Sequence, residues 1–356
     1  MINFPGRSYV NFLLPRKTKE DLFRIYNFVV SKLPKREAYP KYLSLNLTTR
    51  CNLRCTICDR TGFQTSDMDF ENIAKLKKPI KHAKMIDLTG WGEAILYRKY
   101  ADVVAYIFSL NNRRKLISQT SNGVMVEKYA ELVRGRLERF VISLNAATPE
   151  TYNREMKGGD FDKTISSIQT FMSKITSEDR KTVKLHFVTH VNNYREMPLF
   201  VELAKFLNVD QVSYGQYMCS SPDTEQNTLL NIKSEYNAML TKVDEASKKF
   251  KVEVFYRRFG ENLGLTSDNC RFPFDWCYVD TNGDIVPCCY LGNIIMGNVF
   301  DNDFESAWFG EEIQKLRESR YLPACSFCAP FQSFDNQCCH FASRYNFKKR
   351  QLDGKI

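Results

Sequence analysis

Residues 42–58 read YLSLNLTTRCNLRCTIC, an alternating apolar run that leads directly into three cysteines. The alternation predicts a half-buried β-strand, and Cys51, Cys55 and Cys58 follow it at the spacing CxxxCxxC. A structural zinc site normally uses four Cys or His ligands, whereas a cubic iron–sulfur cluster held by three cysteines keeps one iron free to bind something else. The lack of an obvious fourth ligand is therefore the first indication of function.

The composition is that of a large folded protein with metal or redox chemistry. The 356 residues are enough to bury a core without disulfide bonds. The sequence has no apolar run of about 18 residues and no signal-peptide pattern at its start, so we expect a cytoplasmic protein without membrane spans. Its net charge of +10 is scattered among acidic residues, so we expect no nucleic-acid partner.

The twelve cysteines fall into two groups. Three lie within residues 51–58, eight lie within residues 270–339, and Cys219 stands between the groups. In a reducing compartment, cysteines grouped in this way indicate metal binding or redox chemistry rather than disulfide bonds. The sequence therefore predicts two metal sites.

Short β-type runs alternate with amphipathic helical patterns over most of the chain. Six strands are expected, at residues 42–48, 85–90, 115–123, 139–147, 183–191 and 209–218. Such alternation implies right-handed crossovers and a parallel sheet. We therefore predict an α/β fold, a partial (β/α)6 TIM-like barrel whose chemistry lies in the loops at the C-terminal ends of the strands.

The composition changes near residue 260, after a long helical pattern and a last strand, KVEVFYRRF at 251–259. Beyond it, cysteines, aromatic residues and turn residues dominate. We expect three parts: an N-terminal helical extension at 1–40, the barrel at 41–260, and a small C-terminal cysteine-rich domain at 261–356.

The CxxxCxxC spacing and the predicted barrel together resemble the radical SAM superfamily, and the resemblance covers most of the chain. It implies that Cys51, Cys55 and Cys58 hold a [4Fe–4S] cluster whose free iron chelates S-adenosylmethionine (SAM). In that family, reductive cleavage of SAM gives a 5′-deoxyadenosyl radical that abstracts hydrogen from a substrate. The resemblance also implies an electron donor such as flavodoxin or ferredoxin. A zinc site completed from elsewhere in the chain is the alternative.

Several further segments resemble the cofactor-binding positions of that family. LTGWGEAIL at 88–96 is similar to the GGEP element, with Trp91 and Ala94 in place of a glycine and the proline. Glycine there would let the backbone approach the methionyl amino group. The cofactor contacts that the resemblance implies are Gly90, Trp91, Gly92, Glu93, Asn122, Ser143 and Asn145. Ile57 departs from the family pattern, since many relatives carry an aromatic residue there.

Two histidines fall on the predicted strand 183–191. Alternation places His186 and His190 on the same face of that strand. His190 would lie near the C-terminal end, where it would either meet the substrate or be a hydrogen-bonded structural histidine.

The C-terminal cysteines resemble the SPASM and twitch extensions of the same superfamily. Cys270, Gly283 and Cys288 follow the opening pattern CX(9–15)GX4C, and NGD at 282–284 would form the turn of a hairpin. The later SPASM spacing is broken after Cys328. The resemblance therefore implies one auxiliary [4Fe–4S] cluster of the twitch type, with the ligands Cys270, Cys288, Cys325 and Cys328. A zinc ribbon is the alternative, and other cysteines remain open as replacement ligands or as ligands of a second auxiliary cluster: Cys277, Cys289, Cys338 and Cys339.

The resemblance implies oxidation or epimerisation of a small polar metabolite, such as a sugar or an aminocyclitol. Modification of a ribosomally made peptide or a protein side chain is an alternative, as is a non-enzymatic iron–sulfur or zinc module. Anaerobic sulfatase-maturing enzymes carry an aspartate base directly after the GX4C cysteine, and Cys289 stands there instead. A thiol has a pKa about four units higher than a carboxyl group, but it can donate a hydrogen atom. Cys289 is thus either the catalytic donor of an epimerase or a mere neighbour of a ligand.

Overall fold

The computed structural model describes residues 38–58, 64–217, 226–260, 271–286 and 294–319. The chain divides into two units, residues 1–38 and 39–356, and the fold described here is that of the second unit. The expected N-terminal extension at 1–40 lies almost wholly outside the described residues.

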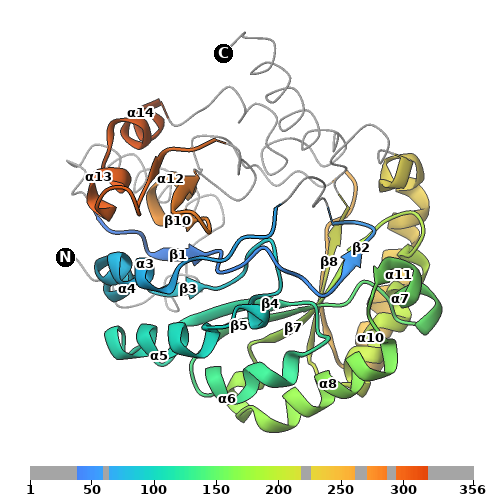
Figure 1. The fold of residues 1–356 in the computed structure, drawn as a ribbon. Coiled ribbons are helices and arrows are strands. Elements are labelled where there is room, and N and C mark those ends of the chain that lie inside the picture. Colours follow the sequence, from blue (N-terminus) through green and yellow to red (C-terminus); the bar gives the residue numbers. More distant parts are fainter. Residues whose placement is uncertain (1–37, 59–63, 218–225, 261–270, 287–293, 320–356) are drawn as a thin grey trace, which may run out of the picture. The chain divides into compact units, whose positions relative to one another are not determined.

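Six parallel strands form the predicted partial barrel, and the α/β fold prediction is confirmed (Figure 1). Their spatial order follows the sequence, with β2 and β6 in a separate two-stranded sheet. The six strands are β1 (Tyr42–Leu45), β3 (Met85–Asp87), β4 (Ile117–Ser121), β5 (Leu137–Ser143), β7 (Val183–Thr189) and β8 (Gln211–Gln216). The small sheet pairs β2 (Arg54–Cys55) with β6 (Met156–Lys157).

Helices connect the strands and cover the outer face of the sheet (Figure 1). Side-chain caps begin several of them; Asp160, for example, accepts a hydrogen bond from the Lys163 N–H at the start of α8. The α-helices of the barrel are α3 (Phe70–Ile73), α4 (Lys77–His82), α5 (Tyr100–Leu110), α6 (Ala130–Val133), α7 (Pro149–Glu155), α8 (Phe161–Lys174), α9 (Ser177–Arg180), α10 (Met197–Phe206) and α11 (Lys233–Phe250). Single 3-10 turns are η1 (Ala74–Leu76), η2 (Ala94–Leu96), η3 (Val126–Tyr129), η4 (Tyr194–Glu196) and η6 (Leu229–Ile232).

The sheet continues past the six barrel strands at both edges. Strand β9 (Glu253–Phe255) pairs in parallel with β8, and β10 (Trp276–Val279) pairs in parallel with β1. The hairpin predicted around NGD is confirmed, because β10 pairs antiparallel with β11 (Asp284–Val286). At its turn, Gly283 has a φ of +91°, and a Cβ there would lie 2.4 Å from the Phe300 ring.

The remaining C-terminal elements are short. They are β12 (Gly297–Asn298), α12 (Phe272–Asp275), α13 (Phe304–Trp308) and α14 (Glu311–Ser319). Strand β12 pairs with β11, so the described part of the cysteine-rich region extends the barrel sheet.

The two faces of the sheet differ in polarity. Along β7, Leu185 and Phe187 are fully buried, and Phe187 packs on Phe200 of α10 with ring centroids 4.8 Å apart. Lys184 and His186 alternate with them on the inner face, where they are half-buried. The outer face thus supplies the core, and the inner face supplies polar groups. Among the described residues, no helix is both long and apolar enough to cross a membrane.

Candidate active site

The cysteine trio lies in a loop that follows β1 and folds back onto β6. Cys55 pairs with Met156 across β2 and β6, and the Cys58 N–H donates to the Cys55 carbonyl at 3.2 Å. Cys51 and Cys55 are half-buried and Cys58 is exposed, and none of the three forms a disulfide bond with another described cysteine. Strand β2 and the Cys55–Cys58 turn therefore fix the backbone of this loop.

Three thiols in one loop are a suitable donor set for a [4Fe–4S] cluster. Within the described ranges, no three His, Cys, Asp or Glu side chains are grouped as ligands of one metal ion. A cubane does not require such a group, because each thiolate binds a different iron. The Asn122 Nδ2 lies 3.7 Å from the Cys51 Sγ, where it can donate a hydrogen bond to a thiolate.

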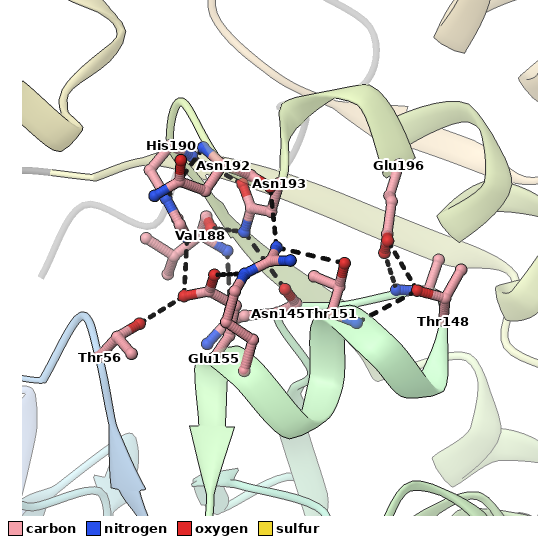
Figure 2. Close-up of polar contacts among 12 residues, drawn as sticks. Thr56, Asn145, Thr148, Thr151, Glu155, Val188, His190, Asn192, Asn193 and Glu196 are labelled. Carbon is pink, nitrogen blue, oxygen red and sulfur yellow. Dashed lines mark hydrogen bonds and ion pairs between the residues drawn. The ribbon is translucent and has the colours of Figure 1, made fainter.

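Glu155, at the end of α7, anchors the loop between Cys55 and Cys58 (Figure 2). The Thr56 N–H donates to the Glu155 carbonyl at 2.9 Å, and the Thr56 hydroxyl donates to the Glu155 carboxylate. Arg154 Nε donates to the same carboxylate at 2.8 Å. Burial would raise the pKa of Glu155, but hydrogen bonds from His190, Thr56 and Arg154 outweigh it and lower the pKa to about 2.

His190 lies on the other side of Glu155, and its expected position on a strand is wrong. Strand β7 ends at Thr189, because the Asn193 side chain accepts the His190 N–H at 2.8 Å and closes a turn. The ring is only 2% exposed, its Nδ1 accepts the Asn192 N–H at 3.4 Å, and its Nε2 lies 3.2 Å from the Glu155 carboxylate (Figure 2). The Nδ1 is thus hydrogen-bonded, whereas the buried Nε2 lies close to the Glu155 carboxylate without the geometry of a hydrogen bond.

The turn after β3 packs tightly against the backbone that leads to Cys51. A Cβ at Gly90 would lie 1.9 Å from Asn46 Oδ1, and one at Gly92 would lie 2.2 Å from the Arg50 carbonyl oxygen. The Glu93 N–H donates to that same carbonyl at 2.7 Å. Both glycines are therefore required for contacts within the protein.

The Glu93 side chain joins this turn to the end of β4. It is 3% exposed, and its carboxylate accepts from the Asn122 N–H at 2.8 Å, the Ser121 hydroxyl at 3.0 Å and the Tyr129 hydroxyl at 2.6 Å. Burial raises the pKa of Glu93, and these hydrogen bonds oppose the shift only in part. Its carboxylate already has three protein donors, so Glu93 positions Asn122 next to Cys51.

The two positions predicted from the end of β5 have different surroundings. The Asn145 Oδ1 accepts the Val188 N–H at 2.9 Å, which ties β5 to the end of β7. Ser143 is half-buried on the inner face, in register with His186. Within the described part of the chain, the Ser143 hydroxyl has no hydrogen-bond partner, so it can bind a ligand.

His186 is fixed on the inner face by groups from β8. Its Nδ1 lies 2.8 Å from the Ser213 hydroxyl, and a Cβ on Gly215 would lie 2.9 Å from its Cε1. Burial lowers the pKa of His186 to about 4, so its imidazole is neutral near pH 7. The sequence placed His186 on this face, but it gave no sign of Ser213 or Gly215, because their contacts join separate strands.

Charged groups lie further toward the N-terminal ends of the strands. Arg139 donates to the Ser118 hydroxyl at 3.0 Å, and its guanidinium lies 3.6 Å from Asp87. The Lys184 Nζ lies 3.7 Å from the centroid of the Phe255 ring, and burial lowers the pKa of Lys184. Together with Ser143, His186 and Ser213, these residues make the inner face polar.

Most of the C-terminal cysteines lie outside the described residues. These include the expected auxiliary ligands and the expected catalytic thiol: Cys270, Cys288, Cys289, Cys325 and Cys328. Cys277 in β10 is fully buried in the core, and burial raises the pKa of its thiol. Cys277 is thus a core side chain.

Comparison with known families agrees with this geometry. Residues 45–204 match the radical SAM superfamily, and residues 270–329 match an iron–sulfur cluster-binding domain, SPASM. The chain therefore belongs to the radical SAM superfamily. More particularly, it is a radical SAM enzyme with a C-terminal SPASM iron–sulfur domain.

Individual relatives are distant. A probable GTP 3′,8-cyclase of Methanococcus aeolicus is 26% identical over 188 residues, which span 48% of this chain and 61% of that protein. A GTP 3′,8-cyclase of Clostridium botulinum is 25% identical over 70% of this chain and 81% of its own length. The solved structure of anSMEcpe with bound AdoMet and the Cp18Cys peptide has a TM-score of 0.62 at 17% identity, covering 89% of this chain and 100% of that one. At such identity, the structural likeness shows the fold.

Proposed function

We propose that this enzyme oxidises or epimerises a small polar metabolite, such as a sugar or an aminocyclitol. The observation that carries the proposal is the polar inner face of the barrel, where the Ser143 hydroxyl and the neutral His186 imidazole are neighbours in register. Hydroxyl and imidazole groups are suited to hydrogen bonds with an uncharged, hydroxyl-rich ligand.

The proposed cluster ligands are Cys51, Cys55 and Cys58. When bound, the cluster and SAM would supply a 5′-deoxyadenosyl radical, and an auxiliary cluster held by Cys270, Cys288, Cys325 and Cys328 would supply an acceptor for one electron. Glu155 would keep the Cys55–Cys58 turn in place through its two bonds to Thr56. The Asn122 amide would donate a hydrogen bond to the Cys51 thiolate.

The proposed SAM contacts are the turn Gly90–Glu93, Asn122, Ser143 and Asn145. All four come from the C-terminal ends of parallel strands, where such barrels bind ligands. The Glu93 carboxylate and the Asn145 Oδ1 are already bonded within the protein. We therefore assign to Glu93 and Asn145 the role of holding the turn and the strand ends around the cofactor.

The substrate would lie on the inner face beneath the cysteine loop. Asn145 follows Ser143 by two residues, about 7 Å along the chain, and the Asn145 N–H lies 3.4 Å from the sulfur of Met156. Met156 is the partner of Cys55 across β2 and β6. This chain of contacts supports a substrate position next to Ser143 and His186.

Oxidation of an alcohol removes a hydrogen atom from carbon, a proton from oxygen and one further electron. We assign the proton to the His186 Nε2, because Nδ1 is engaged by Ser213. Burial keeps the ring neutral and able to accept a proton, but it also makes the ring a weaker base than an exposed histidine. In an epimerisation, the Cys289 thiol would instead return a hydrogen atom to carbon.

We also propose that the barrel and the C-terminal domain meet near residue 260. We propose further that an electron donor such as flavodoxin or ferredoxin reduces the cluster.

A second candidate is the modification of a peptide or a protein side chain. It is favoured by the fold likeness to anSMEcpe, whose solved structure contains a peptide. The inner face of the present chain carries Arg139 and Lys184 as well as His186, so a charged side chain of a peptide would also find partners there.

Product analysis separates these candidates. The anaerobically reconstituted enzyme is incubated with SAM, a reductant and four classes of probe: 2-deoxy-scyllo-inosamine, simple sugars, GTP, and peptides. Oxidation gives a product two hydrogens lighter, and epimerisation in deuterated water gives an isomer with one solvent deuteron on carbon. Turnover of peptides without turnover of the sugar and aminocyclitol probes would overturn the proposal.

The His186→Gln variant then tests the proton acceptor. Glutamine can hydrogen-bond a hydroxyl but cannot take its proton, so hydrogen abstraction and 5′-deoxyadenosine formation should persist while oxidised product falls about 10²-fold or more. The His82→Gln variant, changed at an exposed residue of α4, is the control. Unchanged product formation in the His186→Gln variant would remove His186 from the mechanism.

A further inference from the structure

Asn46, directly after β1, bridges two segments that are distant in sequence. Its side chain is fully buried. The Asn46 Oδ1 accepts the Trp91 N–H at 3.2 Å, and its Nδ2 donates to the Asp280 carboxylate at 2.6 Å. A backbone N–H can only donate and an ionised carboxylate can only accept, so these two partners fix the orientation of the amide.

We infer that Asn46 is a positioning residue that links the turn Gly90–Glu93 to the β10–β11 hairpin, so that Asp280 in the C-terminal domain contributes to SAM affinity. The inference rests on the proposed contact of that turn with SAM. It makes the cofactor turn dependent on a carboxylate 234 residues away from Asn46 in the chain.

The tight packing at Gly90 makes the turn sensitive to the position of the amide. A Cβ at Gly90 would lie 1.9 Å from Asn46 Oδ1 and 3.2 Å from the Asn46 Cα. The turn therefore lies directly on this side chain. If the amide rotates or moves to find another partner, Gly90 and the Trp91 N–H must move with it.

The Asp280 carboxylate is itself held in place by the hairpin turn. Its Oδ1 also accepts the Thr281 N–H at 2.8 Å, while the Asp280 N–H donates to the Asp284 carbonyl at 2.9 Å. The Asn46 N–H adds a bond to the Val279 carbonyl at 3.0 Å. A rigid turn thus presents the acceptor to Asn46, and the same hairpin leads toward the proposed ligand Cys288.

Exchanging the two side chains tests the link. The Asn46→Asp variant places two carboxylates face to face and removes the donor, so SAM affinity should fall about tenfold or more. The Asp280→Asn variant keeps an acceptor oxygen and should lose less. The double variant N46D/D280N restores one donor and one acceptor between the two side chains, but it turns an amide NH2 toward the Thr281 N–H, which bonds the same Asp280 oxygen in the wild type. Its SAM affinity should therefore recover in part and exceed that of Asn46→Asp.

Two readouts separate positioning from general stability. The dissociation constant of SAM is measured on the reconstituted protein by equilibrium dialysis, and hydrogen exchange of the Trp91 amide is measured on the cluster-free protein. Exchange of the Trp91 amide should accelerate in Asn46→Asp and slow again in part in the double variant. The control is Ser44→Ala. It removes a hydroxyl of β1 that accepts the Trp276 Nε1–H of β10 at 2.6 Å, so it also breaks a contact between β1 and the C-terminal domain.

The Ser44→Ala variant should keep its SAM affinity within about twofold. Wild-type SAM affinity in Asn46→Asp, an equal loss in Ser44→Ala, or no recovery in the double variant would each overturn the inference. If Asn46→Asp does not fold, Asp280→Ala, which removes the acceptor of the Asn46 amide, carries the test. Wild-type values for both readouts in Asp280→Ala would overturn the link. A wild-type protein that does not bind SAM would instead refute the proposed function itself, and the inference with it.

Discussion

Two buried glutamates stabilise the cysteine loop from opposite sides, and their carboxyl groups respond differently to burial. Glu93 and Glu155 are 3% and 2% exposed. The donors around Glu93 are two hydroxyls and a backbone N–H, and burial raises its pKa. Glu155 has Arg154 and His190 beside it, and its pKa falls to about 2. Glu93 has more protein packed around its carboxyl group, and Glu155 has cationic and imidazole partners. Both differences decide which form of the carboxyl group is favoured.

The two glutamates also connect different parts of the site. Glu93 joins the turn Gly90–Glu93 to Asn122 next to Cys51, whereas Glu155 joins the Cys55–Cys58 turn to α7 and His190. The first side depends on neutral hydrogen bonds and the second on a charged network. Substitutions on the Glu155 side should therefore lower the free energy of unfolding more than substitutions on the Glu93 side.

The largest effect is expected from Glu155→Ala. It leaves the buried His190 Nε2 and the Thr56 hydroxyl without their carboxylate partner, while the half-exposed Arg154 keeps other partners. The free energy of unfolding should therefore fall by about 2–3 kcal/mol. Urea unfolding of the cluster-free protein measures it. Glu150→Ala, at an exposed position of the same helix, is the matched control and should stay within about 0.5 kcal/mol. A loss no greater than that of the control would contradict the charged-network account.

A smaller loss is expected from Glu93→Gln. The amide oxygen can still accept from some of the donors around Glu93, so the free energy of unfolding should fall by about 1–2 kcal/mol. The same urea titration compares it directly with Glu155→Gln, which keeps a similar shape in the charged network. If Glu93→Gln lowers the free energy of unfolding more than Glu155→Gln does, the proposed difference between the two sides is wrong.

The pH dependence should have opposite signs on the two sides. The folded-state pKa of Glu155 is lowered, so its contribution is present above pH 4.5 and is lost as the pH falls toward about 2. The folded-state pKa of Glu93 is raised, so its contribution is full below pH 4.5 and is lost as the pH rises through that raised value. The unfolding free energy is measured between pH 3 and 7. Below pH 4.5 it should change less with pH in Glu155→Gln than in the wild type. Above pH 4.5 it should change less with pH in Glu93→Gln than in the wild type. The reverse assignment would contradict the account.

Local patterns predicted one side of the site better than the other. Glu93 lies in a short motif beside glycines, and Cys51, Cys55 and Cys58 have a recognisable spacing. Glu155 lies in no motif, since its partners Thr56 and His190 come from other elements and meet it only after folding. The sequence therefore drew attention to the turn Gly90–Glu93 but not to the residue that anchors the cysteine loop.

The fold shows the same division between local and distant contacts. Alternation predicted the six barrel strands, and NGD predicted the β10–β11 hairpin. The parallel pairing of β10 with β1 joins residues more than 200 positions apart, and no local pattern encodes it. The end of β7 was also missed, because a single side chain, Asn193, closes the turn at His190.

The central claim is that Cys51, Cys55 and Cys58 hold the cluster at which SAM is cleaved. It is tested most directly by measuring iron content and 5′-deoxyadenosine formation in the reconstituted wild type and in the variant with all three cysteines changed to alanine. The wild type should bind about eight iron atoms, two cubanes, and form 5′-deoxyadenosine, while the variant should keep about four and form none. Zinc at unit stoichiometry without iron in the wild type, or SAM cleavage by the triple variant, would contradict the account.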